Sequence, residues 1–394
     1  MSREKIFTAL LMLYALLLSG TFLAGGAVIL MILFFLFDKK ENLKRKLRKA
    51  FGRGLVWWFW AYYLLHVLGY FVSTDKTAAS VHLEHKLAFL LLPPVILGEY
   101  VSPGNIKKVL LFFKNAVILV LVASLTYHFI RYGKGLGEFT HFGFRDLSIS
   151  YFYFSVFILF SVFILDTFKP KYFVLQKITL LFFLILLANR TAILFAVFYF
   201  VFRNKGYRYF FNKYALGSII LFGILLFATD NLLMRKIKVF ARTTDFDMEI
   251  IRTKNRISVT HNTLEQRIYI WSLAGALIKE RFWTGYGTGD FQQALNRQYE
   301  LNNFKAARLH RFNTHNQFLQ EFLKFGIGGF LFFVLWIGYL LKISMGKPVL
   351  SLVVWLIVWG SLFESYWLRH HGILFIAFFI PLLYKYYEQA SNHE

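Results

Sequence analysis

The sequence has no cysteine, few prolines and a shortage of acidic residues. Its 394 residues include six prolines, and 21 Asp and Glu stand against 45 Lys and Arg. Without cysteine there are no disulfides, thiolate metal ligands or thiol nucleophile. The net charge of +24 would suit nucleic acid, but the basic residues stand in short tracts between apolar runs. We therefore expect no nucleic-acid partner.

Apolar residues are abundant, at 57% of the chain, and aromatic residues make up 20%. A soluble domain could not bury that much apolar surface, and about 20 apolar residues cross a bilayer as a helix. We therefore predict an all-α, polytopic membrane protein of about twelve transmembrane helices. The expected spans are roughly 6–19, 21–37, 55–73, 86–100, 108–130, 150–167, 172–189, 191–203, 214–229, 314–341, 349–365 and 371–387.

The N-terminal stretch is basic and then apolar, as in a signal peptide. No small-x-small cleavage site follows, and apolar sequence continues to Phe37. This pattern favours a retained first span.

Basic loops set the expected topology. Loops 39–53, 104–108, 169–171, 203–213 and 342–347 are all basic and fall on one side of the segmented chain. The positive-inside rule puts them, and both termini, in the cytoplasm. The run from Lys39 to Arg53 is interpreted as a topology anchor that contacts anionic membrane lipids. We expect one membrane domain, residues 1–394, with a large extracytoplasmic insert at 230–313 between the ninth and tenth spans.

Titratable residues gather where that insert meets the tenth span. Arg308, Arg311, His315 and Asn316 lie close together in sequence, just before a long apolar run. A neutral imidazole can accept a proton near pH 7, so His315 is the candidate general base. The alternative for a single interfacial histidine is that it caps the helix or contacts headgroups.

Two further arginines point to an anionic substrate. Arg190 lies between two apolar spans, and Arg267 begins an amphipathic segment. Guanidinium groups match phosphate oxygens in a bidentate way, so the pair suggests a pyrophosphate clamp. The alternatives are a snorkelling Arg190 and a salt bridge from Arg267 to Glu265.

Glu364 stands at the outer end of the eleventh expected span, where a carboxylate requires a partner. It is a candidate to orient His315 or to pair with an arginine. Pairing with Arg369 is the structural alternative.

Two other motifs are weaker. Gly285, Gly287 and Gly289 alternate, which favours a tight turn over a phosphate-binding loop. Asp245 and Asp247 form a D-x-D pattern near Glu249 that could hold a divalent ion, but the surrounding stretch has mixed charge, which favours a solvated loop. No metal is therefore expected.

The linear order of these motifs resembles the O-antigen ligase and polymerase superfamily of bacterial envelope glycosyltransferases. The resemblance rests on LLANRTAIL around Arg190, an R-x-x-x-W-x-x-A helix, a glycine turn, and a motif that begins at His315 and Asn316 and ends at Gly326. One departure is Thr284, which stands where the family usually has proline before the turn.

The resemblance implies a GT-C-like enzyme of the bacterial inner membrane with its active site on the periplasmic face. It implies transfer of a glycan from undecaprenyl pyrophosphate to a sugar acceptor, without nucleotide-sugar, metal or other cofactor. His315 would act as the base, and Arg190, Arg267 and Arg311 would hold the leaving pyrophosphate. The sequence favours a ligase that uses lipid A-core as the acceptor, with a polymerase that uses the same donor as the alternative. A lipid-linked glycan transporter and a non-catalytic scaffold are the rivals from other classes.

Overall fold

The structure, a computed structural model, describes residues 2–20, 23–133, 139, 150–203, 238, 241–260 and 262–390. Every regular element among these residues is a helix, and no strand occurs there, so the all-α prediction is confirmed. The chain divides into two compact units. The first comprises Met1–Leu11, Gly25–Lys107 and Thr243–Glu394, and the second comprises Met12–Ala24 and Lys108–Arg242.

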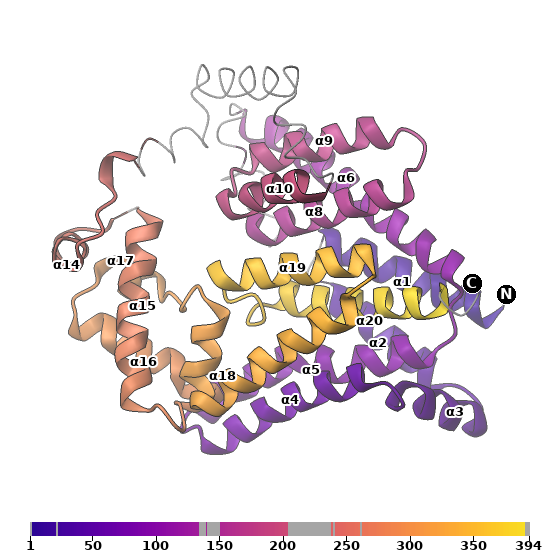
Figure 1. Ribbon diagram of the computed structural model, residues 1–394, viewed down its shortest axis with the longest axis horizontal. Coiled ribbons are helices and arrows are strands. Elements are labelled where there is room, and N and C mark those ends of the chain that lie inside the picture. Colours follow the sequence, from indigo (N-terminus) through magenta and orange to yellow (C-terminus); the bar gives the residue numbers. More distant parts are fainter. Residues whose placement is uncertain are drawn as a thin grey trace. The chain divides into compact units, whose positions relative to one another are not determined.

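The helices are drawn in Figure 1. They are α1 (Arg3–Gly20), α2 (Ala24–Leu36), α3 (Lys40–Phe51), α4 (Gly54–Val72), α5 (Lys76–Gly98), α6 (Pro103–Tyr132), α8 (Tyr151–Phe168), α9 (Phe173–Leu186), α10 (Arg190–Arg203), α14 (Met248–Ile257), α15 (Thr263–Glu280), α16 (Gly287–Leu301), α17 (Lys305–His310), α18 (Gln317–Ser344), α19 (Pro348–Phe363) and α20 (His370–Ala390).

Several helices can cross a membrane. Within the described residues, α4, α5, α6, α8 and α18 are long and apolar enough, which makes five candidate spans. The expected count of about twelve is not confirmed, because α2, α9 and α19 have 13, 14 and 16 residues and fall short of the roughly 20 that a perpendicular crossing needs. The expected span 214–229 lies outside the described residues.

Helices α4 and α5 give the first unit two distinct ends. Helix α4 has 19 residues and rises about 28 Å, close to the thickness of a bilayer's hydrocarbon core. Basic α3 precedes its first residue. At its other end, the amides of Thr74 and Asp75 each donate to the carboxylate of Asp290 on α16 at 2.7 Å. The basic helix and the insert helices α14 to α17 therefore lie at opposite ends of the α4–α5 pair (Figure 1).

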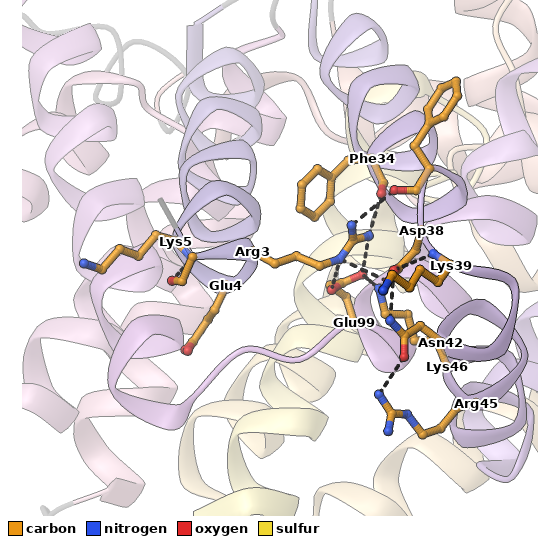
Figure 2. A network of polar contacts seen from close by, with 12 residues as sticks. Arg3, Glu4, Lys5, Phe34, Asp38, Lys39, Asn42, Arg45, Lys46 and Glu99 are labelled. Carbon is orange, nitrogen blue, oxygen red and sulfur yellow. Dashed lines mark hydrogen bonds and ion pairs between the residues drawn. The ribbon is translucent and has the colours of Figure 1, made fainter.

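The α3 end is held by a network of ion pairs (Figure 2). Glu99, after α5, accepts from Arg3 Nε at 3.0 Å and from Lys46 Nζ at 2.6 Å. Arg3 also lies 3.3 Å from Asp38, and the hydrogen bond from Lys46 holds the pKa of Asp38 well below its ordinary range. Three segments far apart in sequence are thereby joined where they meet the basic loop.

At the opposite end, α18 is broken at Gly326, which has φ 62 and ψ −160. The break frees backbone groups that pair with the turn between α15 and α16: Ile327 N donates to Phe282 O and Tyr286 N donates to Leu323 O, both at 2.9 Å. The two backbones approach so closely that a Cβ on Gly285 would lie 2.4 Å from Lys324 main-chain atoms. The glycines of this turn thus permit the insert to pack on α18.

Candidate active site

The candidate base lies immediately before α18. Asn316 caps this helix, with its Oδ1 accepting from Leu319 N at 3.0 Å and its Nδ2 donating to Leu362 O at 3.1 Å. His315 has φ 46, a left-handed conformation in which its amide donates to Asn313 Oδ1 at 2.8 Å. Few residues other than glycine adopt this backbone conformation, and such strained residues concentrate at functional sites.

The ring of His315 contacts a carboxylate. Its Nδ1 lies 3.0 Å from Oε2 and 3.2 Å from Oε1 of Glu364, the residue that follows α19. An ionised carboxylate only accepts hydrogen bonds, so Nδ1 carries the proton and the lone pair of the neutral ring is on Nε2. The His315 side chain keeps 19% exposure, so a ligand can reach it from outside.

Several charges act on Glu364. Burial opposes its ionisation, but the hydrogen bond from His315 and the electrostatic attraction of His315, Arg267 and Arg369 outweigh this effect and lower its pKa below the ordinary value of 4.5. Glu364 is therefore a carboxylate at neutral pH. Arg267 therefore acts electrostatically on the carboxylate that contacts His315.

A buried network of hydrogen bonds fixes the loop that carries His315. Trp271 Nε1 on α15 donates to Thr314 O at 2.9 Å. Thr314 Oγ1 donates to Gln320 Oε1 at 2.9 Å and lies 3.2 Å from Ser365 Oγ. Sequence reasoning did not predict this role for Thr314, Gln320 and Ser365, because the loop and the α19–α20 turn are far apart along the chain. The tryptophan of the R-x-x-x-W motif was the one available signal.

Arg267 lies one turn before Trp271 on α15 and so shares the face that meets the His315 loop. Glu265, its alternative partner, accepts from Lys254 Nζ at 3.2 Å and from the amide of Asp245 at 2.7 Å. Arg190 opens α10 in the second unit, and its relation to His315 stays a prediction.

The other two predicted arginines occupy a different surface. Arg308 and Arg311 are exposed at α17 and line a cleft of about 1350 Å³ that contains neither His315 nor Glu364. The lining of this cleft is therefore separate from the candidate base and its carboxylate.

The glycine turn and the D-x-D motif have structural roles. The amide of Gly289 donates to Ser73 Oγ at 2.9 Å, so it is engaged within the protein. Asp245 forms an ion pair with Lys254, and Asp247 caps α14 by accepting from Glu249 N at 2.8 Å. Among the described residues, no group of three or more His, Asp and Glu side chains gathers as metal ligands would.

The charge on Glu364 can be tested by Glu364→Gln. We expect kcat to fall by roughly 10- to 10⁴-fold, the upper figure being the loss when a triad carboxylate becomes an amide. Because the folded pKa is lowered, the carboxylate stabilises the fold above pH 4.5, and this contribution disappears as the pH falls through the lowered pKa. The Tm of the wild type and of Glu364→Gln, measured from pH 7 downward, should differ by an amount that narrows below pH 4.5. A Tm difference that stays constant with pH would contradict the lowered pKa of Glu364.

Part of the chain matches a known protein family. A family model described as O-antigen ligase matches residues 175–334. The matched region includes Arg190, Arg267 and His315 and ends before Glu364. No curated protein matches the chain.

Proposed function

We propose, from the match of residues 175–334 to the family model described as O-antigen ligase, that the protein is an O-antigen ligase of the bacterial inner membrane. It transfers a glycan from undecaprenyl pyrophosphate to lipid A-core oligosaccharide during lipopolysaccharide synthesis. A polymerase that uses the same donor and extends another lipid-linked glycan is the alternative within the same chemistry.

The observation that carries the proposal is the contact between His315 Nδ1 and the Glu364 carboxylate at 3.0 Å. It leaves Nε2 as the basic atom. The acceptor hydroxyl gives its proton to Nε2 while its oxygen bonds to the anomeric carbon of the donor. The bond from that carbon to the pyrophosphate oxygen breaks, and undecaprenyl pyrophosphate leaves with the electron pair. Attack from the face opposite the leaving group inverts the anomeric centre, so a product that keeps the donor's configuration would contradict the mechanism.

The leaving group needs its developing negative charge stabilised more than it needs a proton. Arg267 supports this role, because its charge already acts on the carboxylate of the His315–Glu364 pair. Arg190 is proposed to complete the clamp, with Arg311 contributing from the edge of the neighbouring cleft. The reaction as written requires no metal ion, so activity should survive a chelator.

The topology supports a periplasmic site. The basic helix α3 and the insert helices lie at opposite ends of α4, a helix of 19 residues. Since basic segments stay in the cytoplasm, the end that carries His315 is proposed to face the periplasm, with both termini inside.

A deletion strain tests the function directly. We expect its lipopolysaccharide to lack polymer, while full-length polymer accumulates on the carrier lipid, and the wild-type gene should restore the surface polymer. Single repeats attached to the lipid A-core would instead identify a polymerase. A purified protein that moves a lipid-linked glycan across liposomes without forming a glycosidic bond would identify a transporter.

A further inference from the structure

The insert carries a cleft that the proposed chemistry uses only at its edge, through Arg311. Its volume is about 1350 Å³, and its walls come from the α4–α5 turn, the end of α15, α16 and α17. This exceeds the roughly 300–1,000 Å³ of typical small-molecule sites. The cleft is therefore large enough for an extended ligand.

Basic side chains predominate along the cleft. Its cations are Arg281, Arg297, Lys305, Arg308 and Arg311, and its acids are Glu280, Asp290 and Glu300. Asp290 already accepts from two backbone amides, which reduces its demand for a cation from the cleft. The balance favours an anionic ligand.

Two of these guanidinium groups are available to a ligand. The side chains of Arg297 and Arg311 are exposed, and neither forms a hydrogen bond or ion pair with the described residues. Arg308 is also exposed, and its guanidinium donates to one partner in the described part of the chain, Asn303 Oδ1 at 3.0 Å.

Amide side chains on α16 complete the lining. Gln293, Asn296 and Gln298 face the cleft among the cations. An amide both donates and accepts hydrogen bonds, as recognition of sugar hydroxyls requires. Cations and amides together are complementary to a saccharide that bears negative charges.

The cleft also borders the loop of the candidate base. Arg311 lines it, and His315 follows four residues later, so their Cα atoms are at most about 14 Å apart. Gln292 and Tyr299 on α16 donate to Phe312 O at 3.0 and 3.1 Å, which fixes this short connection against the cleft wall. A ligand of a few sugar units could occupy the cleft and still reach Nε2 of His315.

We infer that this cleft binds the acceptor of the transfer reaction, and that the acceptor is a negatively charged oligosaccharide. The inference rests on the proposed function, because only a transfer reaction has an acceptor. It makes Arg297 and Arg308 contacts to the acceptor, while Arg311, at the edge of the cleft, and Arg267 stay with the donor. Specificity for the acceptor is then set in the insert, apart from the residues that perform the chemistry.

Equilibrium binding in lipid nanodiscs tests the inference without turnover. The probes are a phosphorylated core oligosaccharide and the same oligosaccharide after removal of its phosphates. We expect Arg297→Gln combined with Arg308→Gln to weaken binding of the phosphorylated probe about 10-fold or more, since hydrogen bonds to charged groups contribute on this scale. Binding of the dephosphorylated probe should be nearly unchanged. Arg252→Gln, which alters an exposed arginine of α14 outside the cleft, is the matched control.

Equal losses in the double variant and the control, or no loss in either, would overturn the inference. So would a wild-type protein that ignores both probes but responds to the anionic lipid content of the nanodisc, because the cleft would then bind lipid headgroups. Glycosyl transfer is measured separately. If the phosphate-dependent binding is found and no transfer is detected with any donor, the proposed function fails while the saccharide site stands.

Discussion

Replacing His315 by alanine is expected to lower kcat by about 10²- to 10⁴-fold, the usual contribution of a general base. The variant would have no positioned base to take the proton of the acceptor hydroxyl, while the arginines that hold the donor remain. KM for the donor should therefore change little. The measurement is glycan transfer by purified protein in nanodiscs, with the amount of folded protein checked by size-exclusion chromatography.

His310→Ala is the matched control for this prediction. His310 is exposed at the end of α17 and stacks on Phe312 with ring centroids 5.5 Å apart. Removing it alters the same loop without touching Glu364, and activity should stay near the wild-type value. A folded His315→Ala protein with full activity would defeat the base assignment and revive a non-catalytic role.

Replacing Glu321 by alanine is expected to cost about 3–5 kcal/mol of stability, a large part of the roughly 5–15 kcal/mol that holds a folded protein together. Glu321 is fully buried in α18, and its Oε1 accepts from Tyr62 OH at 2.9 Å and from Gln317 Nε2 at 2.5 Å. The same oxygen lies 3.3 Å from Nζ of Lys324, which is also fully buried. Removing the carboxylate leaves a buried ammonium group without its counter-charge.

Thermal unfolding in detergent measures this effect, and Glu321→Ala should lower Tm by on the order of 5–10 °C or abolish a monodisperse preparation. Glu321→Gln keeps an acceptor for Tyr62 and removes only the charge, so its loss should be smaller. The double variant Glu321→Leu with Lys324→Met removes both charges together and should recover most of the loss. An unchanged Tm for Glu321→Ala would show that the pair contributes nothing.

The helical class of this protein could be predicted because it depends on local sequence alone. Apolar runs such as 55–73 and 108–130 appear as helices α4 and α6, since backbone groups in a bilayer can be satisfied within a single helix. The number of membrane spans was harder to predict from the sequence than the helical class. Short runs such as that of α9, with 14 residues, have the composition of a span without its length.

The candidate site divides in a similar way. His315 and Arg267 were identifiable because each stands in a motif that the family match covers. The hydrogen-bonded partners of the His315 loop were not, because Ser365 lies 51 residues from Thr314 and belongs to another turn. The buried role of Glu321 was also invisible, since its partner Tyr62 is 259 residues away.

Composition and residue order indicated an all-helical membrane protein whose arginine and histidine motifs resemble those of the O-antigen ligase superfamily. Tertiary structure alone decided that Glu364 faces His315, that Asp245 pairs with Lys254, and that the glycine turn packs against the break in α18. The physical reason is range. Hydrophobicity and charge are properties of single residues and can be read directly from the sequence. A hydrogen bond of 3 Å between distant segments exists only after the fold brings them together.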